Sequence, residues 1–298
     1  MRAEELGSSG LRVSRVGLGG NNFGRRLDLE GTRAVVEAAL DAGITFFDTA
    51  DVYGGGNSER FLGEILEGRR EQVVLATKFG MGTQSVGPAA GSREYLRAAL
   101  ARSLERLRTD YVDLFYYHRP DGATPIADTV AAMSELVEEG SIRAIGVSNF
   151  DGRQLDEAVE AAPVAALQNE YSLLQREAER EVLPRSRTLG VSFIPYFPLA
   201  SGLLTGKYRR GQRAPAGSRL EGRYDRLTGE AFDRVETLEE FAKERGHTLL
   251  ELAIAGLASQ PGIPSVIAGA TSPEQVRANA GAAAWHLAEP ELDELLSA

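Results

Sequence analysis

The chain has 298 residues and a formal net charge of −10, with 33 lysine and arginine residues against 43 aspartate and glutamate residues. This acidic balance argues against a sequence-general nucleic-acid binder, and no apolar run reaches the roughly 20 residues that a membrane span requires. The absence of cysteine excludes disulfides, thiolate chemistry and cysteine zinc sites. The first residues lack the apolar stretch of a signal peptide, so we expect a cytoplasmic protein.

The chain opens with a predicted β-hairpin, in which residues 4–6 and 11–13 are joined by Gly-Ser-Ser-Gly. Short apolar runs typical of buried strands then alternate with helical patterns. The predicted strands are 16–18, 44–47, 73–77, 112–117, 143–147, 165–168, 191–196 and 265–268. The predicted helices are 32–40, 59–66, 94–107, 126–138, 153–161, 176–189 and 232–258, the last broken at Gly246.

Eight strands that alternate with helices, without a break in composition, favour one closed (β/α)₈ barrel over two doubly wound halves. We therefore expect an α/β protein in which residues 1–298 form a single TIM-barrel domain. Long loops at 80–91 and 207–229 follow the third and seventh barrel strands. Both leave C-terminal strand ends, where barrel enzymes keep their active sites.

The second barrel strand ends in an acid and is followed by a tyrosine. Asp48 closes the apolar run, Tyr53 comes five residues later, and three glycines then precede Ser58, which is placed to cap the next helix. This order holds the Tyr53 phenol over the barrel mouth, beside Asp48. Taken alone, this stretch fits an ordinary strand–turn–helix unit with a surface tyrosine equally well.

Two more strand ends carry groups that suit acid chemistry. Lys78 ends the third barrel strand and His118 follows the fourth. Each of them alone could have a purely structural role. A lysine at a strand end is often a solvated charge, and a lone histidine is often a structural residue whose hydrogen bonds are satisfied within the protein. Together with Asp48 and Tyr53, however, they form a coherent proton-donating site at one mouth.

Tyrosine is a poor proton donor at neutral pH because its pKa is near ~10. A nearby ammonium stabilises the phenolate and lowers that pKa by roughly 1–3 units. We therefore expect Lys78, held by Asp48, to lower the pKa of Tyr53, and His118 to orient the substrate oxygen by a hydrogen bond. Such a positioned acid accelerates a reaction by about 10²–10⁴. These residues predict protonation of a carbonyl oxygen.

Three other kinds of site are not supported. No glycine cluster completes G-x-G-x-x-G, so the Rossmann fingerprint is absent. Residues 202–208 resemble a Walker A loop, but the run is one residue short and has Tyr208 where a magnesium-binding serine or threonine belongs. The chain's histidines, His118, His247 and His286, are scattered, which argues against a metal-dependent hydrolase. We predict no metal.

Five passages, in order, resemble the aldo-keto reductase family, and the resemblance covers the whole chain. They are Gly-Ile-Thr-Phe-Phe-Asp-Thr-Ala-Asp-Val-Tyr-Gly at 43–54, Thr-Lys-Phe at 77–79, Gly-Val-Ser-Asn-Phe at 146–150, Tyr-Phe-Pro-Leu-Ala-Ser-Gly-Leu-Leu-Thr-Gly-Lys-Tyr at 196–208 and, less completely, Gly-Ala-Thr-Ser-Pro-Glu-Gln-Val-Arg-Ala-Asn at 269–279. The resemblance implies hydride transfer from a reduced nicotinamide to an aldehyde or ketone. It implies that Tyr53 is the acid, that Lys78 and Asp48 tune it, and that His118 orients the carbonyl.

The resemblance also implies a cofactor site. Ser148, Asn149 and Gln168 would hold the carboxamide, and Tyr196 would stack on the nicotinamide. The remaining implied contacts are Gly20 and Asp48 near the ribose, Pro198, Leu199, Gly202 and Lys207 along the pyrophosphate, and Gly269, Thr271, Gln275 and Asn279 at the adenosine phosphate.

The last helix is predicted to begin at Ser272, with Pro273 in its first turn, and its N-terminus is a natural anion site. Many family members hold the 2′-phosphate of NADPH with a lysine and an arginine near this helix. Here Gly269, Thr271 and Gln275 are uncharged, and Arg277 points away if Gln275 and Asn279 face the ligand. NADPH is the family default and our prediction, with NADH as the alternative.

Arginines are concentrated in the 207–229 loop, at 209, 210, 213, 219, 223 and 226. We expect this loop to close over the cofactor phosphates, the alternative being a solvated basic loop. The substrate pocket is expected to be bordered by Asn22, Phe23, Tyr53, His118, Arg119 and the 80–91 loop. Arg119 suggests an anionic or hydroxylated substrate, although it could equally pair with Asp121.

We expect a small-molecule carbonyl substrate as the partner, no nucleic-acid or membrane partner, and a monomer or weak oligomer. One alternative function stays open at this point. A non-catalytic nicotinamide-sensing subunit, like the barrel partners of potassium channels, would resemble the same family.

Overall fold

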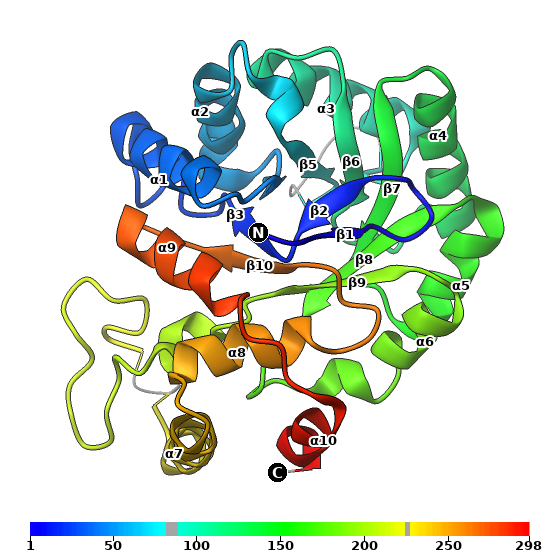
Figure 1. Cartoon of the computed structure of the whole chain (residues 1–298). Helices are drawn as coiled ribbons and strands as arrows, with labels where there is room; N and C mark the ends of the chain where they lie inside the picture. Colours follow the sequence, from blue (N-terminus) through cyan, green and yellow to red (C-terminus); the bar gives the residue numbers. More distant parts are fainter. Residues whose placement is uncertain (82–88, 224–226, 298) are drawn as a thin grey trace.

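The computed structural model describes residues 1–81, 89–223 and 227–297. Within them, eight parallel strands close into a barrel in the order β10-β3-β4-β5-β6-β7-β8-β9 (Figure 1). The strands are β3 (Val16–Gly19), β4 (Phe46–Asp48), β5 (Val74–Phe79), β6 (Val112–Tyr117), β7 (Ile142–Ser148), β8 (Val164–Glu170), β9 (Ser192–Tyr196) and β10 (Val266–Gly269). The predicted (β/α)₈ barrel is confirmed.

The predicted N-terminal hairpin is also present. β1 (Ala3–Glu5) pairs antiparallel with β2 (Arg12–Ser14) and lies across one end of the barrel (Figure 1). Its Leu6, Leu11 and Val13 are buried in one cluster with inward-facing residues such as Phe46 and Ile194. The hairpin therefore plugs the barrel interior, while a larger apolar cluster joins the strands to the surrounding helices.

Helices surround the barrel (Figure 1). They are α1 (Leu29–Asp41), α2 (Asn57–Ile65), α3 (Arg93–Leu107), α4 (Ile126–Glu138), α5 (Gly152–Ala161), α6 (Val182–Thr188), α7 (Gly229–Glu244), α8 (Leu249–Ala258), α9 (Pro273–Ala282) and α10 (Glu289–Ser297). Short 3₁₀ segments are η1 (Tyr53–Gly56), η2 (Arg70–Gln72), η3 (Glu177–Glu179) and η4 (Ala200–Thr205). Many of the helices start at a serine, threonine or aspartate that accepts a backbone N–H bond, such as Ser92, Asp151 and Ser272.

Two helix predictions differ from the structure. The predicted helix 176–189 is divided into η3 and α6, because Pro184 is tolerated in the first turn of a helix but would break a continuous one. The helix α10 was not predicted from the sequence pattern. It has only two buried apolar residues, Leu292 and Leu295, and so a weak periodic signal.

Ser58 does not cap α2, contrary to the prediction. The helix begins at Asn57, two residues before the predicted start at residue 59, because the preceding glycines adopt positive φ angles that end with 89° at Gly56. Ser58 is fully buried in the first turn, where its hydroxyl donates to the Gly20 carbonyl at 3.0 Å and lies 2.8 Å from the Thr49 hydroxyl. It therefore anchors the loop after β3 to the end of β4.

No helix in the parts of the chain that the structure describes is both long and apolar enough to cross a membrane.

Candidate active site at the C-terminal end of the barrel

The parallel register brings the predicted polar residues to one end of the barrel. Asp48 is paired with Gly19 on one side and Ala76 on the other, and Ser148 is opposite Gln168. Because all eight strands run in the same direction, residues at their C-terminal ends converge on one mouth.

A fully buried ion pair lies at the centre of this mouth. Lys78 Nζ is 2.5 Å from Asp48 Oδ1 and donates to the Thr49 carbonyl at 2.9 Å, and neither charged side chain is more than 3% exposed. Gln168 Nε2 donates to the second Asp48 oxygen at 2.9 Å. A buried pair of this kind is tolerated only with close geometry and additional hydrogen bonds, both of which are present.

Tyr53 lies over this pair, with its ring centroid 5.4 Å from Lys78 Nζ and 6.0 Å from the His118 ring, which it meets edge to face. The four residues predicted to form the acid site are therefore close together. The expected direction of the Tyr53 pKa is wrong, however. Burial raises the pKa of Tyr53 well above its usual value, and the carboxylates of Asp48 and Asp51 raise it further.

The main physical reason is burial, which penalises the charged phenolate, and the charge balance around Lys78 is the second. The Lys78 charge is already matched by Asp48 in direct contact, and burial lowers the pKa of Lys78 while Asp48 acts against this change. The Lys78 charge, matched in this way, does not bring the pKa of Tyr53 below its usual value. The phenol keeps its proton and can donate it, with the Lys78 ammonium 5.4 Å from the centre of its ring.

His118 is held as a neutral imidazole. Burial lowers its pKa to about 3, and the positive charges of Lys78 and Arg119 act in the same direction. Its backbone carbonyl accepts a bond from Asn149 Nδ2 at 2.9 Å. Nδ1 is buried and has no partner in the described part of the chain. A neutral imidazole offers one N–H donor, which suits it to orient a carbonyl oxygen.

Sequence reasoning missed the acids around this centre. Burial raises the pKa of Asp51 to about 6, with Glu59 adding to the effect, and Asp51 Oδ1 is buried without a partner among the described residues. Glu59 is fully buried, but Arg106 Nε lies 2.6 Å and Thr77 Oγ1 2.5 Å from its two oxygens. Both acids are visible in the sequence, but their burial is not.

The residues expected to hold the nicotinamide are bonded to one another. Ser148 Oγ donates to the Gln168 carbonyl at 2.7 Å, Asn149 Nδ2 donates to Ser148 Oγ at 3.1 Å, and the Tyr196 hydroxyl donates to Asn149 Oδ1 at 2.8 Å. Asn149 adopts a left-handed conformation with φ of 59°, which is costly and typical of functional sites. One polar cluster thus lies at the ends of four neighbouring strands, β6, β7, β8 and β9.

The loop after β9 is tightly turned. Three of its non-glycine residues have positive φ angles, 55° at Phe197, 45° at Ala200 and 60° at Ser201. Gly202 has a φ of 98°, and a Cβ there would lie 2.9 Å from Lys207 Nζ. Lys207 is exposed and has no carboxylate partner among the described residues. Pro198 is buried in this loop, and Leu199 is partly buried.

At the start of α9, Ser272 accepts a bond from the Gln275 backbone N–H, as predicted. The Gln275 side chain turns back, and its Oε1 accepts from the Thr271 N–H at 2.9 Å. Gly269 is exposed. The Asn279 side chain is buried, with the residue 4% exposed, and it forms no hydrogen bond within the described residues, so of the predicted residues on this helix it is the one with an unused side chain.

One substrate prediction needs correction, and a second stays a prediction. Phe23 has no exposed surface and packs in the core, so a substrate cannot touch it in this structure. Asn22 donates to the Ala270 carbonyl at 3.1 Å and accepts from Arg219 at 3.2 Å, so its side chain is engaged near the start of α9 and its contact with a substrate stays a prediction. Residues 82–88 of the predicted 80–91 pocket loop lie outside the described residues.

Arg119 is exposed and does not pair with Asp121. The Asp121 carboxylate is instead used by the Gly91, Ala123 and Thr124 backbone N–H groups at 2.8–2.9 Å. The charge of Arg119 acts on His118 and lowers the pKa of the Tyr196 hydroxyl, against a larger effect of burial. A guanidinium with no ion pair in the described residues therefore borders the mouth.

That the 207–229 loop closes over the cofactor phosphates stays a prediction, and the structure shows which contacts hold this loop. Arg209 and Arg210 form ion pairs with carboxylates of α7, and so hold the loop against that helix. Arg219 reaches back to Asn22, and Arg26 donates to the Gly217 carbonyl at 2.5 Å. The loop is thus fastened to the segment after β3, while Arg226 lies outside the described residues.

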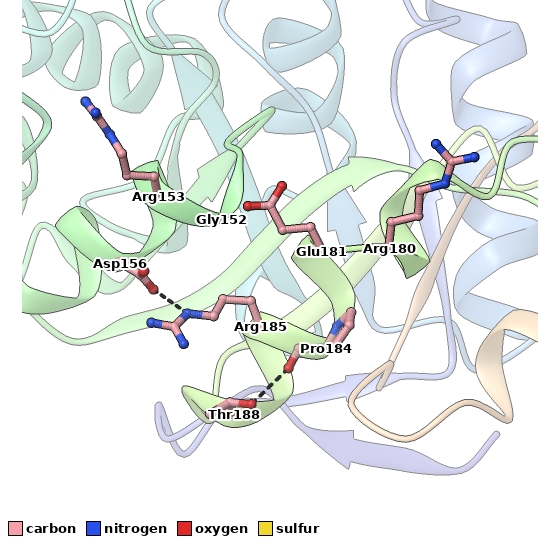
Figure 2. A pocket seen from close by; sticks show the side chains of 8 residues that line it. All are labelled: Gly152, Arg153, Asp156, Arg180, Glu181, Pro184, Arg185 and Thr188. Atoms are coloured by element: carbon pink, nitrogen blue, oxygen red, sulfur yellow. Dashed lines mark hydrogen bonds and ion pairs between the residues drawn. The ribbon is translucent and has the colours of Figure 1, made fainter.

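Two surface cavities lie away from this mouth. One, of about 470 Å³, opens between α5 and α6, where Figure 2 shows Arg185 directed at Asp156, with the two side chains 2.6 Å apart. The other, of about 510 Å³, lies at the opposite end of the barrel, beside α9. Neither is lined by a predicted catalytic or cofactor residue. Among the described residues, no group of three or more histidines and acids could hold a metal ion.

Comparison with known proteins gives a consistent result. The family model described as "Aldo/keto reductase family" matches residues 15–298. The chain is 39% identical to a probable voltage-gated potassium channel subunit beta of Oryza sativa subsp. japonica, over 94% of this chain and 90% of that protein. It is 34% identical to L-glyceraldehyde 3-phosphate reductase of Escherichia coli strain K12, over 94% and 86%. The solved structure of an aldo-keto reductase from Bacillus halodurans in its holo form superposes with a TM-score of 0.85, at 31% identity and coverage of 100% and 96%.

Proposed function

This chain belongs to the aldo/keto reductase family, and from that premise we propose that it transfers a hydride from NADPH to the carbonyl carbon of an aldehyde or ketone. Family membership by itself supports NAD(P)H-dependent carbonyl reduction. The observation that carries the finer proposal is the buried Asp48–Lys78 pair, 2.5 Å apart, beneath a protonated Tyr53 and beside a neutral His118.

Tyr53 supplies the proton. Its raised pKa keeps the phenol protonated at neutral pH, and its proton goes to the carbonyl oxygen as that oxygen becomes an alkoxide. Lys78 Nζ, 5.4 Å from the Tyr53 ring centre, then stabilises the phenolate. An acid placed in this way contributes about 10²–10⁴ in rate, and stabilisation of the developing charge adds to it.

His118 positions the carbonyl. As a neutral imidazole beside Tyr53, it donates a hydrogen bond without competing as an acid, and so directs the oxygen toward the phenol. Asn149 fixes the His118 backbone by its bond to the carbonyl. The Tyr53 hydroxyl and the His118 N–H therefore both donate to the carbonyl oxygen of the substrate.

The chain's residues fit a nicotinamide dinucleotide, which supplies the hydride when bound. Ser148, Asn149 and Tyr196 form one bonded polar cluster beside the acid site. Lys207 has no carboxylate partner in the described residues, and it is exposed beside a loop where a Cβ at Gly202 would crowd it. Such a loop suits phosphate groups. Comparing affinities for NADPH and NADH tests the choice, and a marked preference for NADH would overturn it.

Tyr53→Phe tests the proposal directly. The variant keeps the ring but lacks the proton, so we expect carbonyl-dependent loss of reduced-nicotinamide absorbance to fall at least about a hundredfold while cofactor binding, followed by fluorescence, is retained. Tyr111→Phe, at a tyrosine that stacks with Arg70 outside the site, is the matched control and should keep full activity. Turnover of Tyr53→Phe at the wild-type rate would reject the assignment.

A second function is favoured by one observation, the 39% identity to the rice protein named as a channel subunit. In that case the chain binds NADPH and reports its redox state to a partner without turning over substrate. A panel of aldehydes, ketones and sugars separates the two functions. Tight NADPH binding with no turnover of the whole panel would support the sensing subunit, and turnover that depends on Tyr53 would support the reductase.

A further inference from the structure

The cavity of about 510 Å³ lies at the end of the barrel opposite Tyr53. Its polar lining is supplied by Arg2, Arg15, Arg277 and His286, and its remaining wall is mainly alanine and glycine from the ends of α1 and α9. Met1 also lines this cavity, and Figure 1 shows the N-terminus close to β3 and β10. The volume lies within the range of small-molecule sites, about 300–1,000 Å³.

Arg15 is the unusual member. It is only 6% exposed, its Nη2 donates to the Ala258 carbonyl at 2.7 Å, and its Nε has no partner in the described residues. No carboxylate forms an ion pair with it there, and burial lowers its pKa. The charge of Glu4 acts against this change, but the Glu4 carboxylate is paired with Arg2 at 2.7 Å. A buried guanidinium without a contacting anion is costly.

The other charges around the cavity leave it positive. No acid lines it, although the chain has a net charge of −10. Arg277 is 3.9 Å from Glu274, and both are well exposed, so this pair is weak. The last turns of α1 and α8 direct carbonyl groups toward this end of the barrel. One bond from Arg15 is donated to such a carbonyl, that of Ala258, and its Nε has no partner in the described residues.

We propose that this cavity is a binding site for a small phosphate ester, separate from the cofactor site. The guanidinium groups of Arg2, Arg15 and Arg277 receive the phosphate, because a planar guanidinium matches its oxygens with paired N–H donors. The small residues of α1 and α9 leave room for a compact apolar body. Ala280 lies in this wall.

The test uses phenyl phosphate, which combines the two features, and titrates it calorimetrically into the full chain with NADPH present to occupy the opposite end. We expect one equivalent to bind, and phenol, which lacks the phosphate, to give no heat. Arg277→Gln should weaken binding about tenfold, as expected for loss of one charge-assisted bond. Ala280→Leu, which places a larger side chain in the cavity wall, should weaken it at least as much.

Two variants locate the binding. Arg180→Gln removes an arginine of the other surface cavity, and Lys207→Gln removes the cation expected at the cofactor pyrophosphate. Both should bind phenyl phosphate as the wild type does. The proposal is overturned if wild type does not bind, if Arg277→Gln and Ala280→Leu bind unchanged, or if affinity is lost instead in Arg180→Gln or Lys207→Gln.

Discussion

Three carboxylates act on a single ammonium group at the barrel mouth. Asp48, Asp51 and Glu59 all raise the pKa of Lys78, against a larger effect of burial. Asp48 is in direct contact with Lys78 and Gln168, and Glu59 is satisfied by Arg106. Asp51 is left with one buried oxygen unpaired in the described residues. Of the three carboxylates, it is therefore the one whose charged form destabilises the folded state.

Asp51→Asn is therefore expected to stabilise the protein at neutral pH. The pKa of Asp51 is raised from 3.8 to about 6 in the folded state, so the folded form binds its proton more tightly. Above pH ~6 the charged carboxylate destabilises the fold by up to about 3 kcal/mol, and this penalty disappears as the pH falls through the window to ~4. Urea unfolding should show a gain of roughly 1–3 kcal/mol for Asp51→Asn at pH 7.5 and none at pH 4.

The matched control is Asp41→Asn, at an exposed acid at the end of α1, for which we expect a change below about 0.5 kcal/mol at both pH values. A loss of stability in Asp51→Asn at pH 7.5 would mean that the Asp51 carboxylate is held by a favourable interaction.

Arg119 is expected to favour anionic substrates. Its exposed guanidinium is next to His118 in the chain and without an ion pair in the described residues, so it can meet a carboxylate or phosphate on a carbonyl compound. Arg119→Gln should lower kcat/KM for 4-carboxybenzaldehyde about five- to tenfold and leave that for methyl 4-formylbenzoate within about twofold. Arg12→Gln, on the opposite face, should change neither. An unchanged ratio between the two aldehydes contradicts this role.

At the scale of the elements, side chains hold local segments in place through hydrogen bonds to segments that are distant in the sequence. η1 and α2 follow β4 through consecutive glycines at positive φ, which place Ser58 under the Gly20 loop instead of at a helix cap. The 207–229 loop is similarly fastened by Arg219 to Asn22 and by Arg26 to Gly217. Ser58 was expected to cap its own helix and Arg219 to meet the cofactor phosphates. In the structure each side chain instead contacts the segment that follows β3.

Ser58→Asp distinguishes an anchor from a cap. Caps accept aspartate, so Ser92→Asp, at the true N-cap of α3, should change stability by less than about 0.5 kcal/mol. Ser58 is fully buried next to the buried Glu59, where a new carboxylate has no room or partner, so we expect a loss of more than about 2 kcal/mol. Equal effects of the two substitutions in urea unfolding would restore the cap interpretation.

At the scale of the whole molecule, barrel closure joins residues that are remote in sequence. The contact of Gln168 with Asp48 spans 120 positions, and that of Arg219 with Asn22 spans 197. Closure also separates two ends with different character, the acid site at one end and the arginine-lined cavity at the other. The expectation that residues 1–298 form one domain, and that of a monomer or weak oligomer, stay predictions.

The sequence by itself determined the barrel, because eight apolar runs separated by amphipathic helices have few other ways to bury both faces of their strands. It also placed Asp48, Tyr53, Lys78 and His118 at one mouth, since strand ends of a parallel barrel must meet. Only the tertiary structure decided the charge balance there. Burial and the distances between charges set the pKa of Tyr53 and of Asp51, and these depend on contacts that no local pattern encodes.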